Sequence, residues 1–193
     1  MDQLIFYFKL GLFHVLDINA YDHLLFLVIL TVPYVFKDWK RVLLLVTMFT
    51  LGHTFSLVLS VYGVVSINKS LVEFLIPLTI LISALYNLFT AGKVSKNERV
   101  GLLFFAALFF GLIHGLGFST YFKTVVGSGD KLLPLLEFAL GIEAAQLLIV
   151  IIVLFLSFIF QTIFRFSKRD WVLVTSSMVI GIALLLLIDT KFW

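Results

Sequence analysis

Imidazole and carboxylate side chains recur within the apolar stretches of this 193-residue chain. Groups of both kinds are costly to place in lipid, so each one is a candidate functional residue. Neutral imidazole together with carboxylate suits a divalent transition metal ion such as nickel, cobalt or zinc. The sequence therefore predicts a metal site inside a membrane protein, with the candidate ligands His14, Asp22, His23, His53, His114 and Glu143.

The residue types that are missing narrow this chemistry. The chain has no cysteine and three methionines, which excludes thiolate ligands, iron-sulfur clusters and disulfides and disfavours a Cu(I) path. Magnesium would prefer a site made of oxygen ligands. The sequence also has no Gly-rich nucleotide-binding loop, so we do not expect ATP-driven transport by this chain alone.

The elements that must position these side chains are membrane helices. Hydrophobic residues make up 62% of the chain and charged residues only 13%, and the mean hydropathy is +1.15. We expect one integral membrane domain over residues 1–193, with the lipid bilayer as its solvent. The net charge of +3 comes mainly from basic residues between apolar segments, so no nucleic-acid partner is expected. The sequence does not determine the oligomeric state, and a homo-oligomer is one of the options.

The lengths of the apolar runs predict an all-α, polytopic transmembrane helix bundle. Residues 4–16 form a run of only 13 residues that contains Lys9, which is below the roughly 17 residues needed to cross a bilayer. We expect a short helix there. The start of the chain lacks a basic region and a small-residue cleavage site, so no signal peptide is expected. Six full spans are predicted at residues 20–36, 42–65, 70–91, 99–122, 132–164 and 171–190.

The basic residues between the spans predict the orientation. Nine lie in the loops after the first, third and fifth spans, and four lie on the opposite side. The side with nine is cytoplasmic by the positive-inside rule, which makes the C-terminus extracytoplasmic. The nine are Lys37, Lys40, Arg41, Lys93, Lys96, Arg99, Arg165, Lys168 and Arg169, and the four are Lys69, Lys123, Lys131 and Lys191.

This orientation converts sequence positions into depths. His14, Asp22 and His23 are expected at the outer face, because they flank the start of the first span. His114 falls in the outer half, at 1.5 Å of rise per residue, and His53 and Glu143 fall near the midplane. A single histidine in a membrane helix is as often a packing residue as a ligand. The convergence of four histidines and several carboxylates favours a shared polar site.

Helical spacing adds residues around the predicted site. Ser56 shares a face with His53, and Gln146 shares one with Glu143. Glu73 and Asn87 belong to a polar stripe along the third span, which would extend the path inward. Glu137 is expected to be an interfacial charge.

Several local sequences resemble the HupE/UreJ family of bacterial membrane proteins. They are His14-Val-Leu-Asp-Ile-Asn-Ala-Tyr-Asp22-His23, Phe49-Thr-Leu-Gly52-His53-Thr-Phe-Ser56, Val72-Glu73, Phe110-Gly-Leu-Ile-His114-Gly-Leu-Gly-Phe-Ser119 and Gly141-Ile-Glu143-Ala-Ala-Gln146. The resemblance keeps the order of the motifs through five of the six predicted spans. It implies a small polytopic protein of the bacterial cytoplasmic membrane that acts as a nickel or cobalt permease. The functional residues it implies are His14, Asp22, His23, His53, Glu73, His114 and Glu143.

The leading hypothesis is therefore a divalent metal permease rather than an enzyme. The ion would be captured by His14, Asp22 and His23 and passed toward His53, His114 and Glu143. The inner half has few strong ligands, so a membrane-embedded metallohydrolase stays open, with a His-bound metal that activates water and Glu143 or Glu73 as the base. A metal-binding accessory protein is the third alternative.

Overall fold

The computed structural model describes residues 2–18, 21–92, 100–127 and 129–190, and within them the chain is helical without strands. These ranges contain seven α-helices in succession and a short 3-10 helix, η2, over Phe36–Asp38. Their bounds are α1 Asp2–Leu16, α2 Asp22–Thr31, α3 Trp39–Val61, α4 Lys69–Thr90, α5 Val100–Val126, α6 Leu132–Thr162 and α7 Lys168–Asp189.

Five of these helices, α3 to α7, are long and apolar enough to cross a bilayer. The predicted count of six full spans is therefore not matched. The first predicted span, residues 20–36, contains only the ten-residue helix α2, which is too short to cross alone. Pro33 follows the end of α2 closely, and proline and the residue before it both disfavour continued helix. The apolar run is thus long enough to cross the bilayer, but the backbone restrictions imposed by Pro33 end the helix early.

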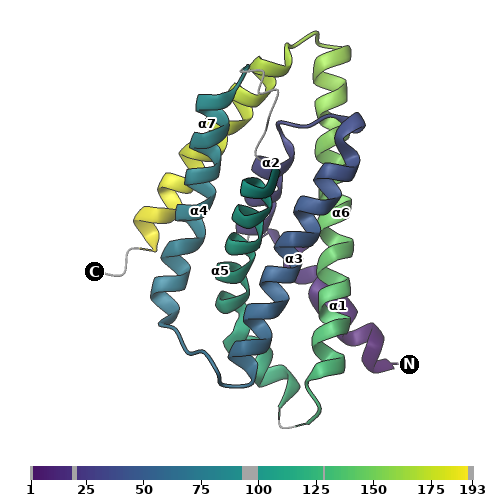
Figure 1. Ribbon diagram of the computed structural model, residues 1–193, viewed down its shortest axis with the longest axis vertical. Helices are drawn as coiled ribbons and strands as arrows, with labels where there is room; N and C mark the ends of the chain where they lie inside the picture. The colour runs from purple at the N-terminus through teal and green to yellow at the C-terminus, as the bar shows by residue number, and fades with distance from the viewer. Residues whose placement is uncertain (1, 19–20, 93–99, 128, 191–193) are drawn as a thin grey trace.

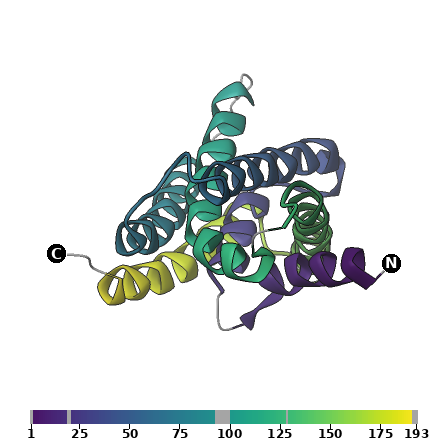
Figure 2. The same cartoon turned by 90° about the horizontal axis from the view of Figure 1, so that it is seen from below.

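The short helices α1 and α2 follow one another through the bundle. In Figure 1, α1 slants from the lower right toward the middle, and α2 continues upward from there. The view from below in Figure 2 shows α1 crossing beside α6 and α2 lying among the long helices. The two short helices together therefore take the place of one interrupted span.

Two helix pairs are in backbone contact through glycines. α1 packs on α6 and α3 packs on α5. A Cβ added at Gly11 or Gly141 would collide with a carbonyl oxygen of the facing helix, and the same holds for Gly52 and Gly111 in the other pair. Small residues of this kind allow membrane helices to approach closely, where packing rather than the hydrophobic effect drives association.

The helix ends carry ordinary stop and start signals. Gly63 and Gly92 have positive φ angles of 77° and 79° and follow the ends of α3 and α4, where a left-handed residue satisfies the last carbonyl groups. The side chain of Asn68 caps α4 and that of Ser167 caps α7. These caps fix the register of α4 and α7.

The outer surface is apolar. Large side chains such as Phe105, Phe155 and Leu185 are more than half exposed, as expected for helices in contact with lipid. The chain is therefore a multi-pass membrane protein. The ends of α2, α4 and α6 lie toward the top of Figure 1, and the start of α1 and the end of α7 lie away from that end. The predicted loop residues Lys93, Lys96 and Arg99 and the terminal Lys191 and Trp193 lie outside the described residues.

Candidate metal centre

Four helices each bring one histidine to the middle of the bundle. His14 lies in the last turn of α1 and His23 in the first turn of α2, and His53 and His114 lie within α3 and α5. The break between α1 and α2 places the first two side by side, with their ring centroids 4.6 Å apart. The glycine contacts between α3 and α5 hold the other two helices close enough to complete the group. We call these four residues the histidine cluster.

The cluster has the dimensions of an ion-binding site. One ring nitrogen from each of His14, His23 and His53 lies within 4.8 Å of the other two. The ring of His114 lies next to His23, with 5.3 Å between the centroids. Three imidazoles at this separation can converge on one ion with small rotations of the rings, because metal–nitrogen bonds are about 2.0–2.1 Å long.

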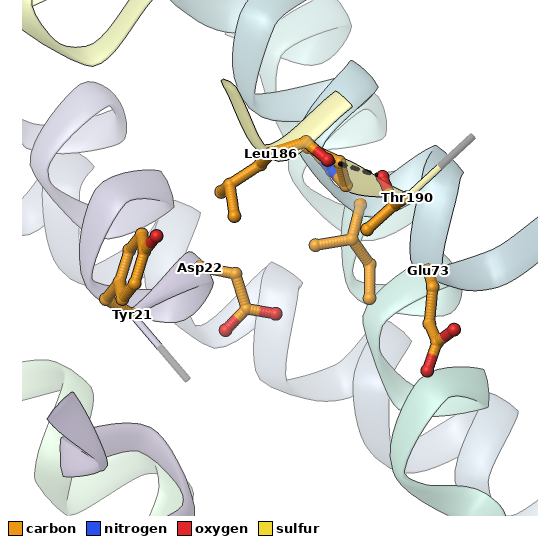
Figure 3. Close-up of a pocket in the computed structure, with 7 residues that line it drawn as sticks. Tyr21, Asp22, Glu73, Leu186 and Thr190 are labelled. Carbon is orange, nitrogen blue, oxygen red and sulfur yellow. Dashed lines mark hydrogen bonds between the residues drawn. The ribbon is translucent and has the colours of Figure 1, made fainter. Parts of the chain in front are cut away.

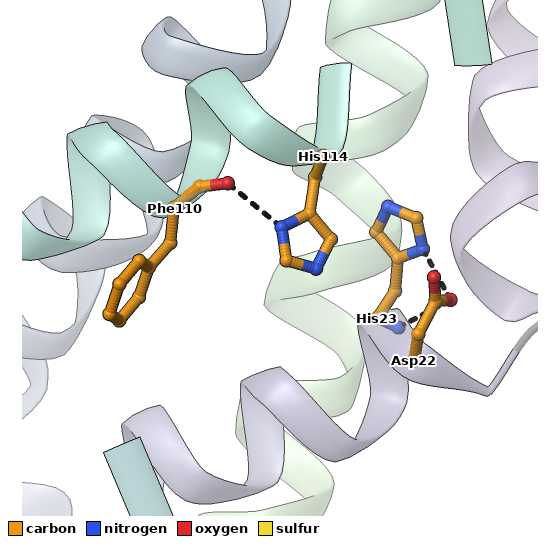
Figure 4. A network of polar contacts seen from close by, with 4 residues as sticks. All are labelled: Asp22, His23, Phe110 and His114. Atoms are coloured by element: carbon orange, nitrogen blue, oxygen red, sulfur yellow. Dashed lines mark hydrogen bonds and ion pairs between the residues drawn. The ribbon is translucent and has the colours of Figure 1, made fainter. Parts of the chain in front are cut away.

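The hydrogen bond of His114 determines which of its nitrogens is available. Its Nδ1 lies 2.8 Å from the carbonyl oxygen of Phe110. A carbonyl can only accept, so Nδ1 carries the hydrogen and donates it, which leaves the lone pair on Nε2. Nε2 is buried and has no hydrogen-bond partner among the described residues. Figure 4 shows this ring between Phe110 and His23.

His23 is oriented in the same way by a carboxylate. Its Nδ1 lies 3.1 Å from Oδ1 of Asp22, and the same oxygen accepts the backbone N–H of His23. Such a carboxylate–histidine pair is the usual outer contact of a metal-binding imidazole, because it fixes the tautomer and raises the basicity of the free nitrogen. Asp22 therefore acts on the cluster through His23 in this structure.

The buried ring nitrogens of the cluster form a set of unpaired groups. Nε2 of His14, His23 and His114 and both nitrogens of His53 have no hydrogen-bond partner among the described residues. His53 is fully buried. Buried polar groups without partners cost free energy, and a cation bound by the ring lone pairs would remove that cost at one nitrogen of each ring. The donor set is imidazole, which suits nickel, cobalt and zinc.

An aromatic shell surrounds the cluster. The ring of Phe118 lies 3.9 Å from that of His14, and Phe49 lies 5.1 Å from His114. Phe26 and Phe138 contact the cluster from the other sides. Such a shell limits the access of water and lowers the local dielectric constant, which strengthens metal–ligand interactions. The shell could not be predicted from the sequence, because nothing distinguishes these phenylalanines from the others in a chain that has 22 of them.

Glu143 belongs to a second polar group, between α3 and α6. Oε1 accepts a hydrogen bond of 2.7 Å from Thr47, and Oε2 accepts one from Thr50. Thr50 also lies 2.8 Å from Oε1 of Gln146. Glu143 is absent from the group of side chains whose ligand atoms lie close enough to share one ion. Thr47 was not identified from the sequence, although it stands six residues before His53 on the same helix.

Three further predicted residues have identified contacts. Ser56 donates to the carbonyl oxygen of His53, and Asn87 donates to that of Ile29 near the end of α2. Glu73 is half exposed and forms an ion pair of 3.2 Å with Lys69. Glu137, expected at the interface, is instead buried, with 3% of its surface exposed and with Oε2 unpaired among the described residues.

A narrow cavity of about 240 Å³ reaches Asp22 from one end of the bundle. It lies between the start of α2, the start of α4 and the end of α7. Asp22 and Glu73 line it from different helices, as Figure 3 shows. The cavity therefore presents two carboxylates, and one of them is the hydrogen-bond partner of His23. We call it the acidic cavity.

A wider cavity of about 710 Å³ opens between the other ends of the same helices. It contains the polar groups of Ser83, Asn87 and Thr90 together with the basic residues Lys168 and Arg169. Phe110, whose carbonyl oxygen binds His114, also lines it. We call it the basic cavity. The histidine cluster thus lies between two cavities that approach it from opposite ends.

The arrangement differs in depth from the expectation. His14, Asp22 and His23 were placed at the outer face and His53 deeper, but the rings of His14, His23 and His53 lie within about 6 Å of one another. The cause is again the interrupted first span. A helix that ends at Leu16 and restarts at Asp22 carries its end residues into the bundle.

A comparison with protein families supplies an independent finding. The family model described as HupE / UreJ protein matches residues 1–190. Comparison with curated proteins and with solved structures gave no match.

Proposed function

This chain belongs to the HupE/UreJ family, and on that premise we propose that it is a permease for a divalent transition metal ion, nickel or cobalt first and zinc next, in the cytoplasmic membrane. The observation that carries the proposal is the set of buried, unpaired ring nitrogens in the histidine cluster. Imidazole is a ligand of intermediate softness, which matches these ions better than magnesium or Cu(I).

The route of the ion follows from the two cavities. A hydrated cation is attracted by Asp22 and Glu73 in the acidic cavity and loses water as it binds the imidazoles. Asp22 holds His23 in position and supplies negative charge next to the ion. On the other side, the hydroxyl and amide groups of Ser83 and Asn87 in the basic cavity receive the departing ion and its water. Binding requires neutral imidazoles, so uptake competes with protons.

The geometry favours a permease over a membrane-embedded hydrolase. A hydrolase needs a carboxylate beside the ion that is free to take a proton from water. Both oxygens of Glu143 accept hydrogen bonds from threonines, and Glu73 pairs with Lys69 at a half-exposed position. A metal-binding accessory protein would need the cluster alone, whereas two cavities that approach it from opposite ends are what a conduit requires.

The test is reconstitution of the full chain into liposomes that contain a metal-sensitive dye. We expect the wild-type protein to carry added Ni²⁺ or Co²⁺ to the dye. His53→Ala should lower metal binding by about tenfold or more, because even the loss of a residue that only contacts a ligand lowers metal affinity by that factor. Ser176→Ala is the matched control, because Ser176 is buried on α7 and is also unpaired. Wild-type protein that binds the ion but moves none across the bilayer would reject the permease in favour of an accessory protein.

A further inference from the structure

Two pairs of helices in this chain carry similar short sequences around a glycine. Phe8-Lys-Leu-Gly11-Leu-Phe-His14 in α1 corresponds to Leu108-Phe-Phe-Gly111-Leu-Ile-His114 in α5. Phe49-Thr-Leu-Gly52 in α3 corresponds to Phe138-Ala-Leu-Gly141 in α6. In this alignment α1 corresponds to α5 and α3 corresponds to α6, and His14 is aligned with His114.

The packing repeats with the sequence. A Cβ on Gly11 would meet the carbonyl oxygen of Phe138, and one on Gly111 would meet that of Phe49, the equivalent residue. The next atoms are the backbone nitrogens of Ile142 and His53, again equivalent and both at 3.0 Å. The α1–α6 contact and the α3–α5 contact are thus one interface used twice.

The remaining pair, α4 and α7, completes the repeat. Both helices have 22 residues and begin after a capping side chain, Asn68 and Ser167. They pack on each other. In Figure 1, α3 runs downward and its equivalent α6 runs upward, and α4 runs upward while α7 runs downward. The unit made of α1 to α4 and the unit made of α5 to α7 are therefore inverted repeats, with α1 and α2 together in the place of α5.

The two cavities are equivalent positions in this repeat. When α4 and α7 are aligned from their caps, Glu73 corresponds to Val172, Leu186 to Asn87 and Thr190 to Ala91. The first member of each pair lines the acidic cavity, and the second lines the basic cavity. Their volumes are unequal, about 240 Å³ against about 710 Å³. If the scaffold is symmetric, a conformation with one wide and one narrow cavity has a symmetry-related counterpart in which the wide and narrow cavities are exchanged.

The helices divide into a group that carries the histidines and a pair, α4 and α7, that packs chiefly on itself and also contacts α2 and α5. All four histidines lie on α1, α2, α3 and α5. The glycine contacts lock α1 to α6 and α3 to α5, and we call these four helices together with α2 the glycine-locked scaffold. Neither α4 nor α7 supplies a histidine. Because the inversion exchanges α4 with α7, the pair maps onto itself, and a tilt that narrows the basic cavity has a symmetry-related counterpart that narrows the acidic one.

We propose that the α4–α7 pair tilts against the glycine-locked scaffold and exposes the histidine cluster alternately through the acidic cavity and the basic cavity. This mechanism rests on the proposed permease function. Inverted repeats with an ion site at their interface permit such exchange, because the two end states use equivalent contacts and lie close in free energy. The structure is then the conformation that is wide on the side of Lys168 and Arg169.

The absence of native cysteine permits a direct test with single-cysteine reporters. Ala91→Cys reports on the basic cavity and Thr190→Cys on the acidic cavity, at equivalent positions. Each full-length variant in lipid nanodiscs is labelled with a membrane-impermeant maleimide, with and without Ni²⁺. Ser66→Cys, exposed in the connection between α3 and α4, is the control for reagent reactivity and should label at a constant rate.

We expect Ni²⁺ to change the two labelling rates in opposite directions. The rising rate should change about fivefold or more and the falling rate about twofold or more, as when a state of about 10% population becomes the major one. Rates that both rise, both fall or do not respond would overturn the exchange, whether or not the liposomes take up metal. Opposite changes without uptake in the dye assay would support the exchange and reject the permease, so the two failures are distinguishable.

Discussion

At the scale of single residues, a neighbouring acceptor fixes the tautomer of two of the four imidazoles. Phe110 holds the hydrogen of His114 on Nδ1, and Asp22 does the same for His23. Both rings therefore present Nε2 to the interior of the cluster. His53 has no such partner on either nitrogen among the described residues, so its tautomer is free to follow the ion. This difference separates two oriented ligands from one adaptable ligand.

The role of Asp22 can be tested by Asp22→Asn. The amide keeps the shape but removes the negative charge, and it can offer a donor where His23 needs an acceptor. We expect metal affinity to fall about 10- to 100-fold, the usual loss when the outer partner of a metal-binding histidine is changed. Isothermal titration of the purified protein with Ni²⁺ measures it. Glu73→Gln is the comparison: Glu73 lines the same cavity but is paired with Lys69 and holds no histidine, so its loss should lower the affinity less than Asp22→Asn does.

Glu143 offers a contrasting prediction at the same scale. Glu143→Gln keeps an oxygen that Thr47 or Thr50 can donate to, so the protein should stay folded. Loss of the charge should slow Ni²⁺ uptake into liposomes, because the carboxylate compensates a cation inside the bundle, while Ni²⁺ binding at the cluster is kept. Equal loss of binding and uptake would instead make Glu143 a ligand.

At the scale of helices, close packing decides where the ligands stand. The α3–α5 contact has no room for a side chain at Gly52 or Gly111, and Gly115 meets the backbone of His53 itself. The histidines are thus carried by the parts of the helices that approach most closely. A change in that distance would move His53 relative to His114.

Gly111→Ala should therefore be damaging although it is a small change. The added Cβ would overlap the carbonyl oxygen of Phe49, and relief requires the helices to separate. Overpacking of this kind costs about 1–3 kcal/mol, which should lower the thermal unfolding midpoint in detergent. Gly181→Ala on α7 is the matched control, because a Cβ there has nothing within 4 Å. An unchanged midpoint for Gly111→Ala would mean that α3 and α5 are not in backbone contact.

The sequence predicted those helices whose length and ends follow from the local run of apolar residues. The spans after the first follow from long apolar runs, and α3 to α7 agree with them within a few residues. The prediction of a full first span was wrong, because a hydropathy average detects neither the break in the helix before Asp22 nor the effect of Pro33. The partners of Glu143 and the aromatic shell could not be predicted, because hydroxyls and phenylalanines in membrane helices usually have ordinary packing roles.

At the scale of the whole molecule, charge and symmetry divide the bundle into two ends. The acidic cavity has carboxylates at one end, and the basic cavity has Lys168 and Arg169 at the other. The repeat makes these ends equivalent in backbone, so the difference in charge arises from side chains alone. It makes the two ends unequal for a divalent cation, which is attracted to the acidic end and repelled from the basic one.

The positive-inside rule then predicts which end faces the cytoplasm. Lys37, Lys40 and Arg41 lie between α2 and the start of α3, and Arg165, Lys168 and Arg169 lie around the start of α7, so that end should be cytoplasmic. A reporter that fluoresces only in the cytoplasm should be dark when fused after Trp193. It should be bright when fused to a chain truncated after Phe166, which ends on the basic side. A bright full-length fusion would contradict this orientation and place the acidic cavity on the cytoplasmic side.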